Sequence, residues 1–179
     1  NLAGAKWICQ QMGVDEADFY EAIASFKGAS KRMEKIAELG SMVVYKDFAH
    51  SPSKVRATTL AVREQYPDRK LLACLELHTY SSLNAEFLKE YHGTLNAADE
   101  AVVFYSPDAV KIKGLEEVTA EQILQALAKP GHKVYTEPMA NQGFLSQTPM
   151  HNTALLLMSS GNYGGLDFDA LPLESSQNF

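Results

Sequence analysis

The stretch "MVVYKDFAHSP", residues 42–52, begins like a β-strand and ends like the start of a helix. Ser51 and Pro52 form a typical helix start, because serine caps the first turn and proline fits its first position. Asp47 and His50 lie between the two elements. Ligands of open α/β sheets usually bind beyond the carboxyl ends of the strands. We therefore expect Asp47 and His50 at a binding site, with the alternative that both only cap the helix.

The composition limits the classes of protein to consider. The 179 residues, 46% of them hydrophobic, suffice for one domain, or for one domain and a fragment of another. A net charge of −6 argues against a broad nucleic-acid or anionic membrane surface. Cys9 and Cys74 lie in apolar runs and are too few for a disulfide framework, so we expect both to be buried in a reducing, cytoplasmic protein. No signal peptide or membrane-span pattern is found in the sequence.

Strands and helices alternate along most of the chain. Strands are predicted at 32–38, 41–48, 71–77, 100–106, 133–137 and 153–160, and helices at 52–66, along 87–98 and from Thr119 onward. This alternation predicts an α/β fold, a doubly wound and mostly parallel sheet over residues 31–179. Residues 1–30 are predicted to form two helices of another domain. Because the chain starts without methionine, we expect a cut fragment, and we expect residues 171–179 to be frayed.

Polar side chains follow four of the predicted strands. They are Asp47 and His50; Glu76, His78, Thr79, Tyr80 and Ser81; Ser106; and Ser159 and Ser160. The carboxyl ends of parallel strands meet at one edge of a sheet, so this convergence predicts a site there. The glycine-rich segment 159–167 has neither a dinucleotide-binding nor a P-loop pattern, and its alternative interpretation is a flexible surface turn. The histidines show no metal-ligand spacing, and His78 alone is compatible with a histidine bonded to backbone.

Two segments in this order resemble the Mur ligases, the ATP-dependent amide-forming enzymes of bacterial cell-wall synthesis. The segment "FKGASKRMEK" (26–35) is similar to the F-x-G-x-x-x-R-x-E pattern that ends the central ATPase domain of the family. The segment "DFAHSP" (47–52) is similar to the D-[YF]-[AG]-H-x-P pattern that opens the third domain. The resemblance implies a Rossmann-like C-terminal domain over residues 31–179, preceded at 1–30 by the closing helices of the central domain.

Two other segments concern the member of the family. The segment "LELHTYSSLN" (75–84) resembles a motif of the alanine-adding ligases, but Thr79 and Ser82 stand where those ligases usually have cations. The ending "LLLMSSGNYGGLD" (155–167) is more similar to ligases of cell-wall recycling, which join UDP-N-acetylmuramate to the tripeptide L-alanyl-γ-D-glutamyl-meso-diaminopimelate. We favour the recycling ligases. The alternatives are an alanine-adding ligase, a folylpolyglutamate-type ligase and a non-catalytic α/β nucleotide-binding module.

The resemblance also implies roles for individual residues. Arg32, Asp47 and His50 are expected to contact ATP, with Asp47 on the ribose hydroxyls, and Asn1 is a further nucleotide candidate. The expected contacts of the peptide substrate are His78, Thr79, Tyr80, Ser81, Ser159, Gly161 and Asn162. A cation for the carboxylates of the peptide is expected nearby, and Lys46 is a candidate. The chain has no G-K-[ST] segment, so Mg²⁺ and most phosphate contacts are assigned to a missing central domain, and the chain alone is predicted not to ligate.

Overall fold

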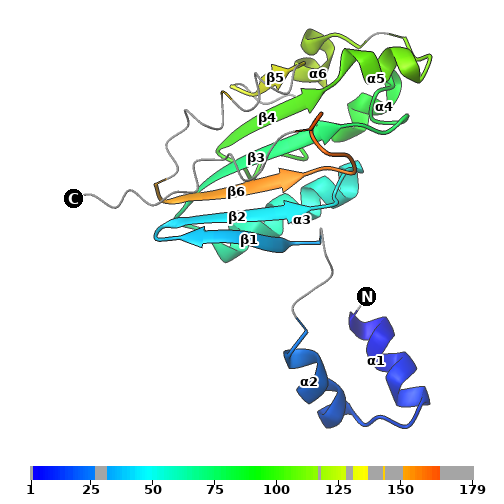
Figure 1. Cartoon of the computed structure of the whole chain (residues 1–179), viewed down its shortest axis with the longest axis vertical. Helices are drawn as coiled ribbons and strands as arrows, with labels where there is room; N and C mark the ends of the chain where they lie inside the picture. The colour runs from blue at the N-terminus through cyan, green and yellow to red at the C-terminus, as the bar shows by residue number, and fades with distance from the viewer. Residues whose placement is uncertain are drawn as a thin grey trace. The chain divides into compact units, whose positions relative to one another are not determined.

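The computed structural model describes residues 2–26, 32–116, 118–127, 131–136, 143 and 151–165. The chain divides into two compact units, Asn1–Ser30 and Lys31–Phe179, which are described separately here (Figure 1). Among the described residues, no helix combines the length and the apolar character needed to cross a membrane.

The first unit is a pair of helices, α1 (Leu2–Gln11) and α2 (Glu16–Ala24). Asp15 caps α2 as predicted, because its carboxylate accepts a hydrogen bond from the Asp18 amide at 2.8 Å. The described part of this unit buries only Phe19. The prediction of a buried Cys9 was wrong, since two short helices cover too little surface and leave this thiol half-exposed.

The second unit is built on a six-stranded, mostly parallel sheet, which confirms the predicted α/β class (Figure 1). Its strands are β1 (Glu34–Leu39), β2 (Met42–Asp47), β3 (Lys70–Leu77), β4 (Glu100–Tyr105), β5 (Lys133–Tyr135) and β6 (Thr153–Met158). The spatial order is β1-β2-β6-β3-β4-β5, and only the β1–β2 pair is antiparallel. The turn between these two strands uses Gly40 at φ +57°, a left-handed conformation that favours glycine.

Both faces of the central strands are buried, as expected of strands inside a parallel sheet. Alternate residues of β3 point to opposite faces. On one face they join the buried side chains of the helices α3 (Pro52–Gln65), α4 (Ala85–Leu88), α5 (Pro107–Ile112) and α6 (Ala120–Leu127). On the other face Leu72 and Cys74 pack with Phe104 and Tyr163. Burial raises the pKa of the Cys74 thiol to about 12.

The helix predicted along 87–98 was wrong in extent. Asn84 caps α4, which passes into the short 3₁₀ helix η1 (Lys89–Tyr91), and turns follow as far as Ala98. Gly93 stands at φ +68°, which no right-handed helix contains, although Leu95 is still buried as its apolar character requires.

Two other helix starts follow simple chemistry. The predicted capping box of α6 is confirmed, because Thr119 and Gln122 exchange backbone-to-side-chain hydrogen bonds of 2.8 and 3.2 Å. Helix α5 was not predicted, although Ser106 and Pro107 repeat the serine–proline start that precedes α3. Ser51 is the N-cap residue of α3 by position, but its side chain makes no capping hydrogen bond.

Candidate functional site

The strand order brings the predicted site residues to one edge of the sheet. Because β6 lies between β2 and β3 and is parallel to both, the carboxyl ends of all three strands meet there. Strand β1 runs the other way and starts at this edge, where Glu34 pairs with Lys46. Arg32, two residues before Glu34, therefore lies near the start of the second unit, at the same edge as Asp47.

The Asp47 carboxylate mainly holds nearby backbone. Its Oδ1 accepts a hydrogen bond from the Ala49 amide at 2.7 Å and a longer one from the Thr58 hydroxyl at 3.4 Å. Its Oδ2 accepts one from the Met33 amide at 2.7 Å. A carboxylate has about four acceptor positions, so three contacts leave one position for a ligand. Asp47 thus fixes the entry into β1 and the loop before α3, and its side chain does not cap that helix.

His50 and Arg32 lie on either side of this anchor in the sequence. The His50 Nδ1 atom is 2.8 Å from the Phe48 carbonyl oxygen, which makes Nδ1 the donor and leaves Nε2 for another partner. The Tyr91 hydroxyl donates to the His50 carbonyl, and burial raises the pKa of Tyr91 to about 12. Arg32 is exposed, and its neighbour Met33 is the residue bound by Asp47.

Glu76 belongs to the polar residues predicted to converge at this edge, but no individual role could be assigned to it from the sequence. It lies in β3 and is only 3% exposed. Its Oε2 accepts hydrogen bonds from the Ser159 hydroxyl and, at 2.9 Å, from the Tyr163 amide, and its Oε1 lies 3.9 Å from His78 Nδ1. A single acidic residue in an otherwise apolar strand was the available signal, because a buried carboxylate needs partners. His78, for which a backbone-bonded histidine was the alternative interpretation, thus also faces a carboxylate.

The segment Ser159–Tyr163, which we call the β6 loop, is packed closely against Glu76. A Cβ atom added to Gly161 would lie 2.7 Å from Glu76 Oε2 and 2.9 Å from His78 Cγ, so only glycine fits without a shift. The Gly161 amide also donates to the Ser159 hydroxyl at 2.7 Å. The alternative of a flexible surface turn therefore does not fit Ser159, Gly161 and Tyr163, whereas Asn162, Gly164 and Gly165 are exposed.

Tyr163 anchors the far end of the β6 loop. Its hydroxyl lies 2.8 Å from the carbonyl oxygens of both Cys74 and Met158, and its ring stacks on Phe104 with centroids 6.5 Å apart. Burial raises the pKa of Tyr163 well above its ordinary value. Tyr163 holds φ +54°, an uncommon conformation for a residue with a side chain. A side chain held this firmly fixes where the loop returns to the sheet.

The loop after β3 carries the other predicted substrate residues. Thr79 and Ser82 close a tight turn by hydrogen bonds of 3.0 to 3.1 Å, one between their two hydroxyls and three between a hydroxyl and the backbone of the other residue. Tyr80 is 63% exposed, and the Lys113 ammonium lies 4.8 Å from the centre of its ring, a cation–π contact. Lys113 is the cation that the structure brings to this loop. Sequence reasoning missed it, because nothing in the sequence links positions 33 residues apart.

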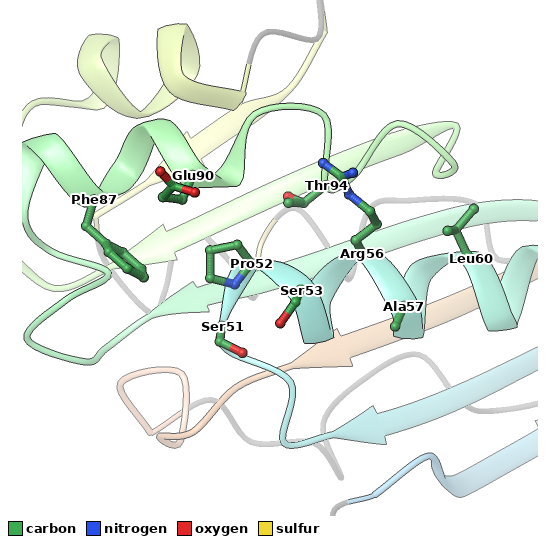
Figure 2. A pocket seen from close by; sticks show the side chains of 9 residues that line it. All are labelled: Ser51, Pro52, Ser53, Arg56, Ala57, Leu60, Phe87, Glu90 and Thr94. Atoms are coloured by element: carbon green, nitrogen blue, oxygen red, sulfur yellow. The ribbon is translucent and has the colours of Figure 1, made fainter.

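A groove of about 770 Å³ lies beside this edge, between α3 and residues 87–94 (Figure 2). Its lining is Ser51, Pro52, Ser53, Arg56, Ala57, Leu60, Phe87, Glu90 and Thr94. None of the predicted site residues lines it, although Ser51 directly follows His50. The groove is therefore a neighbour of the candidate site and not part of it.

Asn1 and a metal site are the two remaining points of the sequence analysis. Asn1 and residues 171–179 lie outside the described residues, so the role of Asn1 stays a prediction. Within the described residues, no group of three His, Cys, Asp or Glu side chains is arranged to hold a metal ion. We therefore assign no Mg²⁺ ligand to these residues.

Comparisons with known proteins identify relatives of this fold. A UDP-N-acetylmuramate–L-alanine ligase of Caldicellulosiruptor bescii is 31% identical over 131 residues, which are 73% of this chain and 28% of the relative. The crystal structure of the UDP-N-acetylmuramate–alanine ligase from Thermotoga maritima matches with a TM-score of 0.66 at 20% identity, over 86% of this chain and 32% of that one. A murein peptide ligase from Psychrobacter arcticus matches with a TM-score of 0.65 at 23% identity, over 96% and 35%.

These matches differ in what they establish. The two solved structures are less than 25% identical to the chain, so they show the fold alone. The chain spans only 28% and 37% of the length of the first two curated relatives. The family model described as "Mur ligase, glutamate ligase domain" matches residues 31–161, which are most of the chain. On this match the chain belongs to the Mur ligase family, with its glutamate ligase domain at residues 31–161.

Proposed function

We propose that the chain is the C-terminal part of an ATP-dependent amide ligase. Its substrates are UDP-N-acetylmuramate and the tripeptide L-alanyl-γ-D-glutamyl-meso-diaminopimelate. The observation that carries the proposal is that the described members of both groups of predicted site residues occupy one sheet edge, where the Ser159 amide donates to the Asp47 carbonyl at 3.0 Å. A ligase must hold an activated carboxyl group and an amine side by side, which a single edge with two adjacent subsites permits.

The nucleotide subsite consists of Arg32, Asp47 and His50. Arginine keeps its charge at every physiological pH and offers several donors, which suits a phosphate group. The remaining acceptor position of Asp47 suits a ribose hydroxyl, and Nε2 of His50 is free for the base. The γ-phosphoryl group of ATP passes to the muramoyl carboxylate, which gives an acyl phosphate and ADP. The amine then attacks the acyl carbon, and the amide forms as inorganic phosphate leaves. Asn1 remains a further candidate for nucleotide contact. We assign the Mg²⁺ and P-loop contacts to a central domain that is not among these residues, so the chain alone is expected not to ligate.

The amine subsite combines the loop after β3 with the β6 loop. Its members are His78, Thr79, Tyr80, Ser81, Ser159, Gly161 and Asn162. The tripeptide brings several carboxylates, and Lys113 supplies a positive charge beside the exposed Tyr80 ring. The polar Thr79–Ser82 turn offers no charge of its own, which is why we assign this role to Lys113. A cytoplasmic location fits these substrates.

L-alanine is the second candidate amine, because the relatives most similar in sequence include several UDP-N-acetylmuramate–L-alanine ligases. Only the chemistry of the amine subsite differs between the two candidates. Alanine needs one carboxylate contact, whereas the tripeptide needs room and positive charge for a larger anion.

The test is an assay of phosphate release by the full-length protein with ATP, UDP-N-acetylmuramate and either amine. We expect turnover with the tripeptide, and a KM for the tripeptide that rises about tenfold in Lys113→Ala, the loss of one charged contact. Lys111→Ala is the matched control, because Lys111 is exposed in α5, two residues before Lys113, and its ammonium lies 3.9 Å from the Asp108 carboxylate. Turnover with alanine alone would overturn the tripeptide assignment, and turnover with neither amine would overturn the ligase.

A further inference from the structure

Glu76 is a buried carboxylate that contacts both loops of the amine subsite. One oxygen, Oε2, accepts from the Ser159 hydroxyl and the Tyr163 amide of the β6 loop. The other oxygen, Oε1, faces Nδ1 of His78 at 3.9 Å, at the start of the loop after β3. No substrate reaches Glu76 directly, because only 3% of its surface is exposed. Its effect on a ligand must therefore pass through the loops that it holds.

The exposed part of the β6 loop lies between two points that Glu76 fixes. Gly161 passes so close to Glu76 and His78 that no Cβ fits, and the Tyr163 amide is bonded to the carboxylate. Asn162, between them, is exposed. Two fixed neighbours leave the backbone of Asn162 little freedom, so a ligand that bonds this residue spends little entropy on ordering it.

We propose that Glu76 is a positioning residue that holds the β6 loop and His78 in fixed relative positions, so that together they form one amine-binding surface. This inference rests on the proposed function and names the residue that organises its amine subsite. Hydrogen bonding at Oε2 carries the effect, and the negative charge is secondary. Misplacing binding groups by about 1 Å costs on the order of a hundredfold in rate, so the loss of this contact is measurable.

Two substitutions of Glu76 separate hydrogen bonding from charge. In Glu76→Gln, the amide oxygen at the position of Oε2 still accepts both hydrogen bonds, while the charge beside His78 is lost. In Glu76→Ala, both the acceptor and the charge are lost. Val102→Ala is the matched control for stability, because Val102 is buried in the same cluster as Tyr163 but is not a member of the proposed site.

The first readout is steady-state kinetics of the full-length ligase with saturating UDP-N-acetylmuramate. We expect Glu76→Ala to raise the KM for the amine at least about tenfold and to change the KM for ATP less than about twofold. We expect Glu76→Gln and Val102→Ala to stay within about threefold of the wild type. An unchanged amine KM in Glu76→Ala, or an equal rise in Glu76→Gln or Val102→Ala, would overturn the inference.

The second readout needs no activity and is amide hydrogen exchange of the 179-residue chain. Glu76→Ala should speed exchange of the Gly161 and Tyr163 amides at least about tenfold, while Glu76→Gln keeps their protection. If the wild-type ligase turns over no amine, the proposed function fails but this measurement still decides the role of Glu76. If it turns over an amine and exchange is unchanged in Glu76→Ala, the role of Glu76 fails alone.

Discussion

Replacing Asp47 by alanine tests whether this carboxylate holds the edge together. The change removes the acceptor of two short hydrogen bonds, each 2.7 Å long, from the Ala49 and Met33 amides. Ala49 is 2% exposed, so its amide has no access to water, and the loss of its hydrogen bond costs about 1–3 kcal/mol. Met33 is half-buried and water can reach its amide in part, so the loss of this second hydrogen bond costs only about 1 kcal/mol.

The sum is roughly 2–4 kcal/mol of the free energy of unfolding. For a domain of this size, 1 kcal/mol corresponds to about 2–4 °C, so Asp47→Ala should lower the Tm by roughly 4–16 °C. Asp47→Asn keeps one acceptor oxygen and should lose about half as much. Lys54→Ala is the control, because Lys54 is exposed near the start of α3 and makes no hydrogen bond of this kind with the described residues.

Urea unfolding followed by circular dichroism measures these differences, with the slope of the transition checked for each variant. A loss below about 0.5 kcal/mol in Asp47→Ala would refute the reasoning, because it would mean that the two amides find other partners. Asp47→Ala can also lose nucleotide affinity because the loops around it are disturbed. Asp47→Asn disturbs them less, so an equal loss of affinity in both variants indicates that Asp47 binds the nucleotide directly.

Three other predictions concern buried groups. Gly161→Ala should lower the free energy of unfolding by about 1–3 kcal/mol in urea titrations, because the new Cβ would press on the Glu76 carboxylate. A thiol reagent at pH 8 should modify the half-exposed Cys9 in the native chain and reach Cys74 only after denaturation, since burial raises the pKa of that thiol to about 12. Burial raises the pKa of Tyr91 from 10.0 to about 12. The protonated Tyr91 hydroxyl therefore contributes fully to stability below pH 10, and this contribution is lost as the pH rises through 12. Urea midpoints should therefore fall between pH 10 and 12, and less steeply in Tyr91→Phe.

Local chemistry in the sequence predicted most elements of the fold but not their lateral order. Apolar runs located β3 and β6, and the Thr119–Gln122 pair located α6, because these signals depend on neighbouring residues. The placement of β6 between β2 and β3 depends on contacts between distant segments. The helix predicted after Asn84 was too long. The buried Leu95 has the spacing of a helical apolar face, but the chain forms turns at this point.

The candidate site shows the same division between local and distant information. The place of Asp47 and His50 at the sheet edge could be predicted because strand end and helix start adjoin in the sequence. The partners of Asp47 were not found, since Met33 reaches it only through the antiparallel pairing of β1 with β2. Lys113 and the contacts of Glu76 were missed for the same reason, because sequence spacing carries no record of which loops meet at an edge.

Asp47 and Glu76 solve one physical problem in the same way. The loops at the carboxyl edge leave the sheet with backbone amides that no strand can pair, and unpaired buried amides cost free energy. A carboxylate at the end of β2 and another near the end of β3 accept from those amides at 2.7 to 2.9 Å. Charged acceptors bind amides more strongly than neutral ones, and this offsets part of the free energy that burying the charge costs. At positions of this kind, substitution by Asn or Gln should lower the free energy of unfolding less than substitution by Ala. An acid that only contacts substrate should show no such difference between the variants. Ranking the variants by unfolding free energy therefore separates the two roles.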